Sequence, residues 1–449
     1  MIVVKFGGTS IDDADAIRRA VEIVRGRLER RPVVVVSALA GVTNTLLTIV
    51  EQASTGQLIG AIRGVENLRD RHLAVAEELL AGHDSARELA GELSTAFDEL
   101  ASLAEALSVL GHATPRSVDV VAAKGEMISS TLIVAAMQAM GLTAEHVDAT
   151  KVVITDERFG RAEPRTDRIA ESSQRHIRPL LDRASVPVMG GFIGGTDQGV
   201  VTTLGRGGSD LSASLVGAAM GAEAIEIWTD VDGMLTADPR IVPEAMLIDR
   251  IRFDEASELA TFGAKVLHPY TIAPAVRLGI PVWILNSRRP EGTGTLVTYD
   301  APVCPVRAIA GKTGVTVIKV RSPRMLLAHG FLRMIFEVFE KHRTSVDVVA
   351  TSEVSVSVTL DDPSRLDTLT VDLSHLGDVS VERNRGIVAL VGAGLTDHSE
   401  TMSRAIAAIG DVRVHMLSLS ASGINLTMLV DGDRVGPVMK ALHAEFFSP

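Results

Sequence analysis

Short apolar runs alternate with stretches of helical periodicity through residue 300 of the chain. Strands are predicted at 2–6, 32–37, 186–189, 224–228 and 280–285, and helices near 13–30 and from about 43. This alternation predicts a mainly parallel sheet covered by helices, which is an α/β fold. Residues 57–110 differ, because they are rich in Ala, Leu, Glu and Arg at helical spacing, and they predict a helical insertion without recognisable chemistry.

The pattern changes at residues 287–312, where Arg, Pro, Gly and Thr accumulate. Beyond them the order is strand, helix, alternating hairpin, helix and strand, and a similar order then recurs. A shift of 68 residues places Val346, Val348, Val356 and Val358 over Val414, Met416, Ile424 and Leu426. Any two alternating hairpins could match this well, but two βαββαβ units are the favoured interpretation. We therefore predict a first domain over 1–300 and two α+β domains over 310–384 and 385–449.

The composition limits the classes of partner. Aromatic residues make up 3% of the chain and the formal net charge is -12, so neither stacking platforms nor basic patches for nucleic acid are predicted. The single cysteine, Cys304, excludes an intrachain disulfide and favours a reducing compartment, with the cytoplasm as the default. The chain opens on a strand-like segment without a signal-peptide pattern, and no uncharged run of membrane-spanning length follows, so neither secretion nor a membrane span is expected.

A pair of glycines follows the first predicted strand, in residues 5–10 (KFGGTS). Backbone N–H groups at Gly7 and Gly8 would let an anion approach closely, and Lys5 would add a positive charge. The pattern is neither a P-loop nor a GxGxxG fingerprint, and a tight strand-to-helix turn explains the glycines equally well.

A second Gly-rich segment, residues 203–210 (TLGRGGSD), opens another predicted helix. A helix N-terminus offers free N–H donors to a carboxylate or phosphoryl group, and Arg206 adds a guanidinium that can grip a carboxylate with two hydrogen bonds. The structural alternative is that Ser209 or Asp210 is an ordinary N-cap residue. Several functional residue types among three glycines favour a binding loop.

Three further patterns have strong structural alternatives. Residues 229–233 (TDVDG) follow a buried strand, where Asp and Gly commonly form only a turn, although ligands of open α/β sheets collect at such strand ends. Glu126 begins an apolar helix, where a first-turn Glu is commonly only a partner of the helix dipole. His268 is interpreted as structural, and the histidines lack metal-ligand spacing, so no metal site made by protein ligands is predicted.

Taken in order, these patterns resemble the aspartate kinase family. The resemblance rests on residues 5–10, 36–38, 125–126, 191–192, 204–210, 229–233, 237–240 and 262–269. It covers the whole chain and implies an amino-acid-kinase domain followed by two ACT domains, most like the lysine-sensitive homodimeric subclass. It also implies transfer of the γ-phosphoryl group of ATP to the β-carboxylate of L-aspartate, as the first step toward lysine, threonine and methionine. Mg²⁺ would be held through the ATP phosphates.

The resemblance assigns roles to individual residues. Lys5 would bridge the ATP phosphates, and Asp210 would sit close to the reacting centre. Arg206 would bind the α-carboxylate of aspartate, and Glu126 would meet its α-ammonium group. The remaining substrate-binding residues would be Ser37, Thr43, Phe192, Gly207 and Ser209. The ATP-binding residues would be Lys5, Gly7, Gly8, Thr229, Asp230, Arg240 and Lys265.

The sequence departs from the family pattern at two places. Leu235 stands where the family often has a nucleotide-contacting Tyr, so nucleotide affinity and base preference are not carried over. An effector site is implied at Met325, Ser345, Asp347, Thr351 and Ser352. Leu327 and Ala328 replace a His and a Ser expected of lysine-sensitive members, which predicts a weakened or altered response to lysine.

Two alternative functions stay open at this point. One is a relative that phosphorylates glutamate, a carbamate or a nucleotide on the same fold, against which the ACT-like units and the pair of Arg206 and Glu126 argue. The other is a catalytically inactive amino-acid sensor, against which the presence of Lys5 and Arg206 argues. Because ACT units bury sheet edges or helix faces against copies of themselves, a homodimer or larger homo-oligomer is expected.

Overall fold

The computed structural model describes residues 1–263, 269–326, 328–397 and 399–447. These residues form two compact units. Unit 1 comprises residues 1–234 and 269–300, and unit 2 comprises residues 235–263 and the described residues from 301 onward. Residues 235–263 therefore group with the C-terminal part of the chain, although the sequence analysis places them in a first domain over 1–300.

Unit 1 is built on a sheet with the strand order β3-β4-β2-β1-β7-β9-β10. Its strands are β1 (Ile2–Phe6), β2 (Pro32–Val36), β3 (Ala144–His146), β4 (Val186–Gly190), β7 (Ile225–Thr229), β9 (Val282–Asn286) and β10 (Thr295–Val297). Neighbouring strands are parallel except β9 and β10. The expected α/β fold with a mainly parallel sheet is confirmed. A short antiparallel hairpin, β5 (Ile193–Gly195) and β6 (Val201–Thr203), forms a separate sheet.

Helices cover both faces of this sheet. The helices of unit 1 are α1 (Ala14–Arg25), α2 (Val42–Ser54), α3 (Leu58–Leu79), α4 (Ala86–Leu110), α5 (Pro115–Ala139), α6 (Ala149–Val152), α7 (Thr166–His176), α8 (Arg178–Asp182), α9 (Gly208–Met220) and α11 (Pro269–Arg277). Successive side chains of a strand point to opposite faces. Val4 and Phe6 of β1 join the core that includes α1, α2 and α5, whereas Val3 lies 3.6 Å from the position of a Cβ on Gly217 of α9. The central strands are therefore mainly apolar, because neither of their faces meets water.

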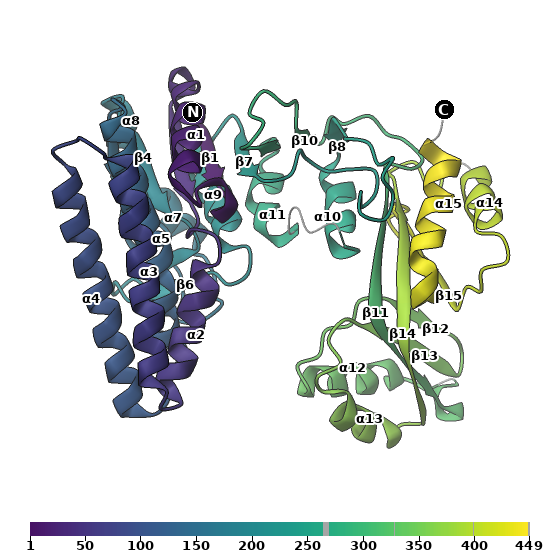
Figure 1. Cartoon of the computed structure of the whole chain (residues 1–449). Helices are drawn as coiled ribbons and strands as arrows, with labels where there is room; N and C mark the ends of the chain where they lie inside the picture. Colours follow the sequence, from purple (N-terminus) through teal and green to yellow (C-terminus); the bar gives the residue numbers. More distant parts are fainter. Residues whose placement is uncertain (264–268, 327, 398, 448–449) are drawn as a thin grey trace. The chain divides into compact units, whose positions relative to one another are not determined.

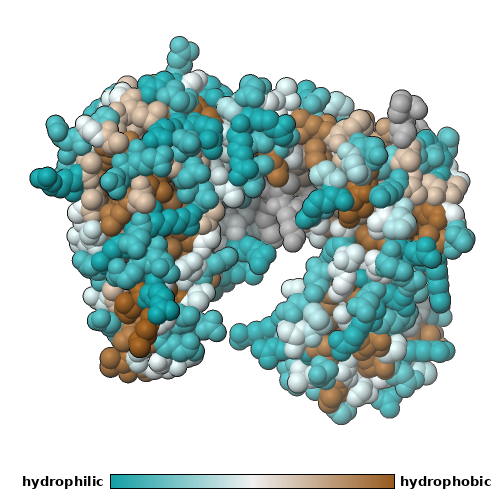
Figure 2. Space-filling model, viewed as in Figure 1, coloured by the Kyte–Doolittle hydropathy of each residue, from teal (hydrophilic) through white to brown (hydrophobic). Residues whose placement is uncertain are grey.

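The helical insertion consists of α3 and α4, which pack against each other as two long rods (Figure 1). The buried ring of His72 on α3 lies 5.2 Å from that of Phe97 on α4. Apolar surface gathers where α3 begins and α4 ends (Figure 2), and Ile59, Val109 and Leu110 are exposed there. Helix α5 is long and apolar enough to cross a membrane, but 67% of its most apolar window is buried inside the fold, as is common for a core helix.

Unit 2 contains an antiparallel sheet with the strand order β12-β13-β11-β14-β16-β15. Its strands are β11 (Ala308–Arg321), β12 (Val349–Thr351), β13 (Ser355–Leu360), β14 (Asp378–Val391), β15 (Met416–Leu419) and β16 (Asn425–Asp431). Its helices are α12 (Phe331–Lys341), α13 (Leu366–Ser374), α14 (Ser399–Ala408) and α15 (Val435–Phe447), and β8 (Arg250–Ile251) and α10 (Phe253–Thr261) precede them in the chain. Strands β11 and β14 run side by side along the whole unit (Figure 1).

Two hydrophobic cores form on this one sheet. Ile318 of β11 packs with α12, α13 and β13, whereas Ile309 of the same strand packs with α14, α15 and β16. Each half then has four strands in the same order, β12-β13-β11-β14 in one and β15-β16-β14-β11 in the other. The expected pair of βαββαβ units is present as two such halves. The second half takes its fourth strand from residues 308–313, so a unit predicted over 385–449 lacks one of its own strands.

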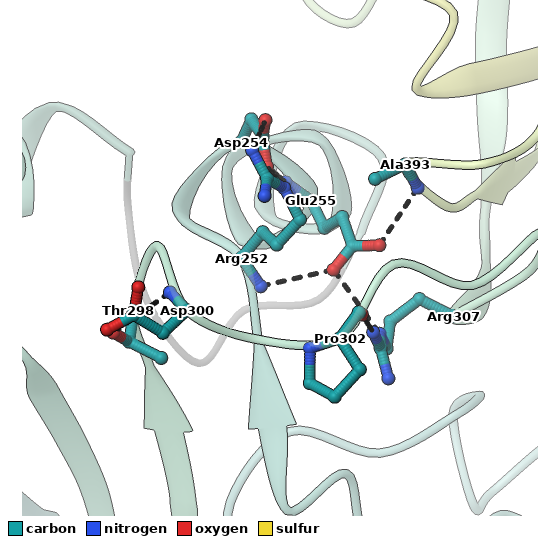
Figure 3. Close-up of polar contacts among 8 residues, drawn as sticks. All are labelled: Arg252, Asp254, Glu255, Thr298, Asp300, Pro302, Arg307 and Ala393. Carbon is teal, nitrogen blue, oxygen red and sulfur yellow. Dashed lines mark hydrogen bonds and ion pairs between the residues drawn. The ribbon is translucent and has the colours of Figure 1, made fainter.

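A buried carboxylate attaches α10 to this sheet. The side chain of Glu255 is fully buried and accepts hydrogen bonds from the Ala393 backbone N–H at 2.9 Å and from Arg307 Nε at 3.2 Å (Figure 3). Its own helix is capped by the same group, because Glu255 Oε2 also accepts from the Arg252 backbone N–H at 3.1 Å. Arg307 precedes β11 and Ala393 follows β14. These contacts explain why residues 235–263 belong to unit 2 rather than to the first domain.

Candidate active site

Unit 1 contains a cavity of about 660 Å³ at the carboxyl ends of β1 and β2. Its lining comes from the end of β1 and the following turn, from residues 37–47 after β2, from one face of α5, and from the segment 203–210 that leads into α9. Carboxyl ends of parallel strands are where ligands of open α/β sheets bind. The two Gly-rich segments recognised in the sequence therefore line one cavity.

An ion pair joins the two Gly-rich segments. Lys5 Nζ lies 2.6 Å from Asp210 Oδ1, and the two side chains are only 9% and 16% exposed. Asp210 stands in the first turn of α9, where the positive end of the helix dipole also favours a carboxylate. The two atoms form an ion pair without the angles of a hydrogen bond. Lys5 is thus held by charge at the cavity, where it can meet an anion.

Glycine is required where the turns after β1 and β2 meet. A Cβ on Gly8 would lie 2.7 Å from the carbonyl oxygen of Ala38, a distance that real Cβ atoms essentially never show. Gly7 donates its N–H to the carbonyl of Trp228 on β7 at 2.9 Å, and Ser37 donates to the carbonyl of Phe6 at 3.1 Å. The turn after β1 is therefore fixed by backbone contacts on both sides.

One face of α5 forms a wall of the cavity. Asp119, Ala122 and Glu126 line it at the spacing i, i+3 and i+7, which places them on the same side of a helix. Glu126 is buried, and its Oε2 has no hydrogen-bond partner among the described residues. Burial raises the pKa of the Glu126 carboxyl to about 8, against smaller opposing effects of backbone hydrogen bonds and the charge of Lys5. This group is ready for a cationic partner from a ligand.

The segment 203–210 presents Arg206 to the cavity. Gly205 and Gly207 on either side have φ values of 77° and 73°, which only glycine adopts without strain. The Arg206 side chain is exposed and forms no hydrogen bond or ion pair with another residue in the described parts of the chain. The guanidinium is therefore available to an anionic ligand opposite Glu126.

Phe192 lines the cavity and has an unusual backbone conformation. Its φ is 65°, and its backbone N–H donates to Ser212 Oγ of α9 at 3.0 Å. A Cβ on Gly208 would lie 2.8 Å from Phe192 Cδ2, and one on Gly191 would lie 2.7 Å from Ser209 Cα. The start of α9 can approach the segment after β4 this closely only because these positions are glycine.

Comparison with known proteins identifies the family of the chain. Residues 1–286 match the amino acid kinase family, and residues 388–446 match the ACT domain. The chain is 37% identical to lysine-sensitive aspartokinase 3 of Escherichia coli, over 100% of this chain and 99% of that protein. The chain belongs to the aspartokinase family.

Other aspartokinases agree with this assignment. Chloroplastic aspartokinase 3 of Arabidopsis thaliana is 35% identical, over 99% of this chain and 81% of that protein. The crystal structure of E. coli aspartokinase III with aspartate and ADP matches with a TM-score of 0.87 at 37% identity, over 100% of both chains. The structure of the same enzyme with lysine and aspartate matches with a TM-score of 0.84 at 36% identity, also over 100% of both chains. The resemblance to aspartate kinases and the expected fold are confirmed.

The structure brings together every residue that the sequence assigned to aspartate. These cavity-lining residues are Ser37, Thr43, Glu126, Phe192, Arg206, Gly207 and Ser209. Lys5, Gly8 and Asp210 line the same space. The lining also includes Asp119, Gly160 and Thr203, which the sequence analysis did not select. Asp119 stands seven residues before Glu126, and this helical spacing was the one signal that pointed to it.

The residues assigned to ATP are more scattered. Thr229 and Asp230 stand at the end of β7, which pairs with β1, but they do not line the cavity. Arg240 belongs to unit 2, where its exposed guanidinium pairs with Asp238 at 2.6 Å. Lys265 lies outside the described residues. Their part in nucleotide binding stays a prediction.

The residues assigned to an effector do not share one cavity. Met325 lines a space of about 330 Å³ with Ala328 and Glu353, and Leu327 lies outside the described residues. Thr351 and Ser352 line another space of about 200 Å³. Ser345 is exposed and lines neither space. Asp347 forms an ion pair with Lys312 at 3.3 Å, and burial raises the pKa of its carboxyl.

Proposed function

We propose that the chain is an aspartate kinase that transfers the γ-phosphoryl group of ATP to the β-carboxylate of L-aspartate and forms 4-phospho-L-aspartate. The observation that carries this proposal is the convergence of the Lys5 turn and the Arg206 loop on one cavity. The relative with the TM-score of 0.87 is described in complex with aspartate and ADP. The reaction is the first step toward amino acids derived from aspartate.

The substrate-binding half of the cavity suits the two ends of an α-amino acid. Arg206 binds the α-carboxylate through its planar guanidinium, and Glu126 accepts the α-ammonium group. Ser37, Thr43, Phe192, Gly207 and Ser209 form the rest of the pocket. The β-carboxylate then points toward Lys5. An N-acylated amino acid would leave the buried Glu126 carboxyl without its cation.

The chemistry needs no general base, because the β-carboxylate is ionised at neutral pH and is itself the nucleophile. The barrier comes from bringing this anion against the triphosphate, so positioning and positive charge are what the protein supplies. Lys5 provides that charge at the γ-phosphoryl group, and Asp210 holds the Lys5 ammonium in place before the nucleotide arrives. Gly8 lines the cavity and offers its backbone N–H group to the phosphates, whereas the N–H of Gly7 donates to the Trp228 carbonyl, so Gly7 would serve the nucleotide only by shaping this turn.

The nucleotide would extend from the β1 side of the cavity toward Thr229 and Asp230 at the end of β7. The roles of Arg240 and Lys265 in nucleotide binding stay predictions from the family resemblance. Among the described residues, no group of three or more His, Cys, Asp or Glu side chains is placed to hold a metal. In this proposal Mg²⁺ is held through the ATP phosphates, where it would neutralise phosphate charge. The single cysteine supports a cytoplasmic location for the enzyme.

The two ACT halves form the regulatory part, with an amino acid as the effector. The predicted site lies near Met325, Ser345, Asp347, Thr351 and Ser352. A homodimer forms through unit 2, because β12 is an edge strand of its sheet and the Val349 side chain on it is 38% exposed. Leu332 and Phe336, one turn apart on α12, add further exposed apolar surface.

We predict that ADP release requires L-aspartate and that Lys5→Met lowers turnover by about a hundredfold to a thousandfold, because the charge at the transferred phosphoryl group is lost. A coupled ADP-release assay with L-aspartate, L-glutamate and N-acetylglutamate measures both effects. Lys151→Met, on the exposed side of α6, is the matched control and should retain full activity. Retained turnover in Lys5→Met would remove the role of Lys5, and turnover with glutamate alone would overturn the substrate assignment.

We predict that kcat/KM for aspartate rises about tenfold per pH unit below pH 8 and levels off above it. The raised pKa of about 8 keeps Glu126 mostly protonated at pH 7, and only its ionised form attracts the α-ammonium group. Steady-state kinetics between pH 6.5 and 9 measure this rise. Glu126→Gln should be slower and lose this pH dependence. A flat wild-type profile over the same range would contradict the assignment.

We predict that submillimolar lysine leaves turnover nearly unchanged. Ala328 supplies no polar side-chain group to the cavity that Met325 lines. The charged residue in the lining of this cavity is Glu353. Turnover assays with added lysine, and with threonine and methionine in parallel, measure the response. Strong inhibition by lysine at submillimolar concentration would show this prediction to be wrong.

We predict that Val349→Lys weakens the homodimer about tenfold or more, because a charge on an edge strand opposes pairing with a second copy. Sedimentation velocity at micromolar protein measures the dissociation. Val371→Lys on α13, a position 61% exposed and away from the sheet edge, is the control that should leave the dimer intact. A wild-type monomer under these conditions would exclude the homodimer, and equal association of the two variants would exclude this edge as its interface.

A further inference from the structure

Asp119 is a buried carboxylate in the cavity wall that the chemistry above does not use. It lies on α5 and is 1% exposed. Its Oδ1 accepts from the backbone N–H of Gly160 at 3.0 Å and from Thr203 Oγ1 at 2.7 Å. Its Oδ2 accepts from the same Gly160 N–H at 2.9 Å and from the backbone N–H of Thr203 at 3.0 Å. One side chain thus ties a helix to two separate segments of the chain.

The chemical nature of these contacts is informative. The ion pairs of the described residues do not include Asp119, so its hydrogen bonds come from neutral donors alone. A buried carboxylate loses its hydration, and only several well-directed donors offset that cost. An amide of the same size would turn an NH₂ group toward N–H donors and would lose part of this set. Position 119 therefore needs a side chain that only accepts hydrogen bonds. A side chain that merely fills apolar space would not need this property.

The segments held by Asp119 form the base of the Arg206 loop. Thr203 is the last residue of β6, and Arg206 follows three residues later. Ala162 donates its N–H to the Thr203 carbonyl at 2.9 Å, which joins the Gly160 segment to the same strand. A Cβ on Gly205 would lie 3.2 Å from the Gly160 carbonyl oxygen. The loop therefore begins from a base whose geometry Asp119 sets.

Arg206 itself has no hydrogen bond or ion pair to the rest of the described chain, so its position follows from its loop. Glu126 projects from the same helix as Asp119, two turns further along. Asp119 thus links the loop of Arg206 to the helix of Glu126. These are the two groups that take opposite ends of the α-amino acid in the proposed function.

We propose that Asp119 is a positioning residue that sets the distance between Arg206 and Glu126 and thereby the affinity for the α-amino-acid end of the substrate. This inference rests on the proposed function. The hydrogen bonds of Asp119 go to Gly160 and Thr203, whereas Thr229 and Asp230, which are assigned to the nucleotide, stand at the end of β7 outside the cavity lining. The effect is therefore confined to the amino-acid substrate.

Asp119→Asn tests the proposal in the full-length enzyme. We expect KM for aspartate to rise about tenfold or more, with KM for ATP within about twofold of wild type and kcat changed less than KM. Thr203→Val removes only the hydroxyl donor and should raise KM for aspartate in the same direction by a smaller factor. The double variant should be no worse than Asp119→Asn alone, because both changes remove the same contact.

Ser130→Ala is the matched control on the same helix. Ser130 is also 1% exposed and contacts His146 at 3.0 Å, but it does not line the cavity. The thermal unfolding midpoint of Ser130→Ala should fall, while its KM for aspartate should stay at the wild-type value. An unchanged KM for aspartate in Asp119→Asn would overturn the proposal. It would also be overturned if the KM values for aspartate and ATP changed equally in all variants, in proportion to the fall in the thermal unfolding midpoint.

These experiments distinguish failure of the role of Asp119 from failure of the proposed function. If Asp119→Asn does not fold, Thr203→Val decides, and an unchanged KM for aspartate in that variant rejects the role. If wild type releases no ADP with aspartate, the proposed function itself fails. If wild type is active and the variants keep its KM for aspartate, only the role of Asp119 fails.

Discussion

The ion pair between Lys5 at the end of β1 and Asp210 in the first turn of α9 fixes the relation between the two Gly-rich segments. Both side chains are largely withdrawn from water, so each charge depends on the other for its stability. Asp210 gains further from the helix N-terminus. Lys5 also lines the cavity, so the same ammonium group can meet a phosphate there. The contact that joins the two segments therefore also keeps the main cation of the site at the cavity.

Much of the fold and of the site could be predicted from local sequence. The apolar strands and their glycine turns have strong local patterns, and Arg206 between two glycines is a visible signal. Asp119 was missed because its partners, Gly160 and Thr203, are far away in the chain, and nothing in the sequence pairs either of them with residue 119. Backbone donors of this kind are not visible in a sequence.

The domain boundaries illustrate a second limit. Hydrophobic alternation identifies strands but not their neighbours, so the pairing of residues 308–313 with the second half of β14 could not be read from it. Residues 235–263 were predicted to be part of the first domain because the composition changes only at residues 287–312. The buried Glu255, which bonds to Ala393 138 residues later, attaches them to unit 2 instead. Long-range polar contacts of this kind decide which segments pack together after the local elements have formed.

The charges around the cavity explain why a free amino acid is the substrate. Lys5 is balanced by Asp210, and Asp119 is satisfied by neutral donors, so neither needs a ligand. Arg206 forms no hydrogen bond or ion pair among the described residues, Glu126 keeps one carboxyl oxygen without a partner there, and burial keeps Glu126 mostly protonated at neutral pH. A zwitterionic amino acid brings a carboxylate for Arg206 and an ammonium group for Glu126 at once. A ligand that lacks the ammonium group would leave the buried Glu126 carboxyl without its cation, and a ligand that lacks the α-carboxylate would leave Arg206 without an anion, so both ends of the amino acid contribute to selection.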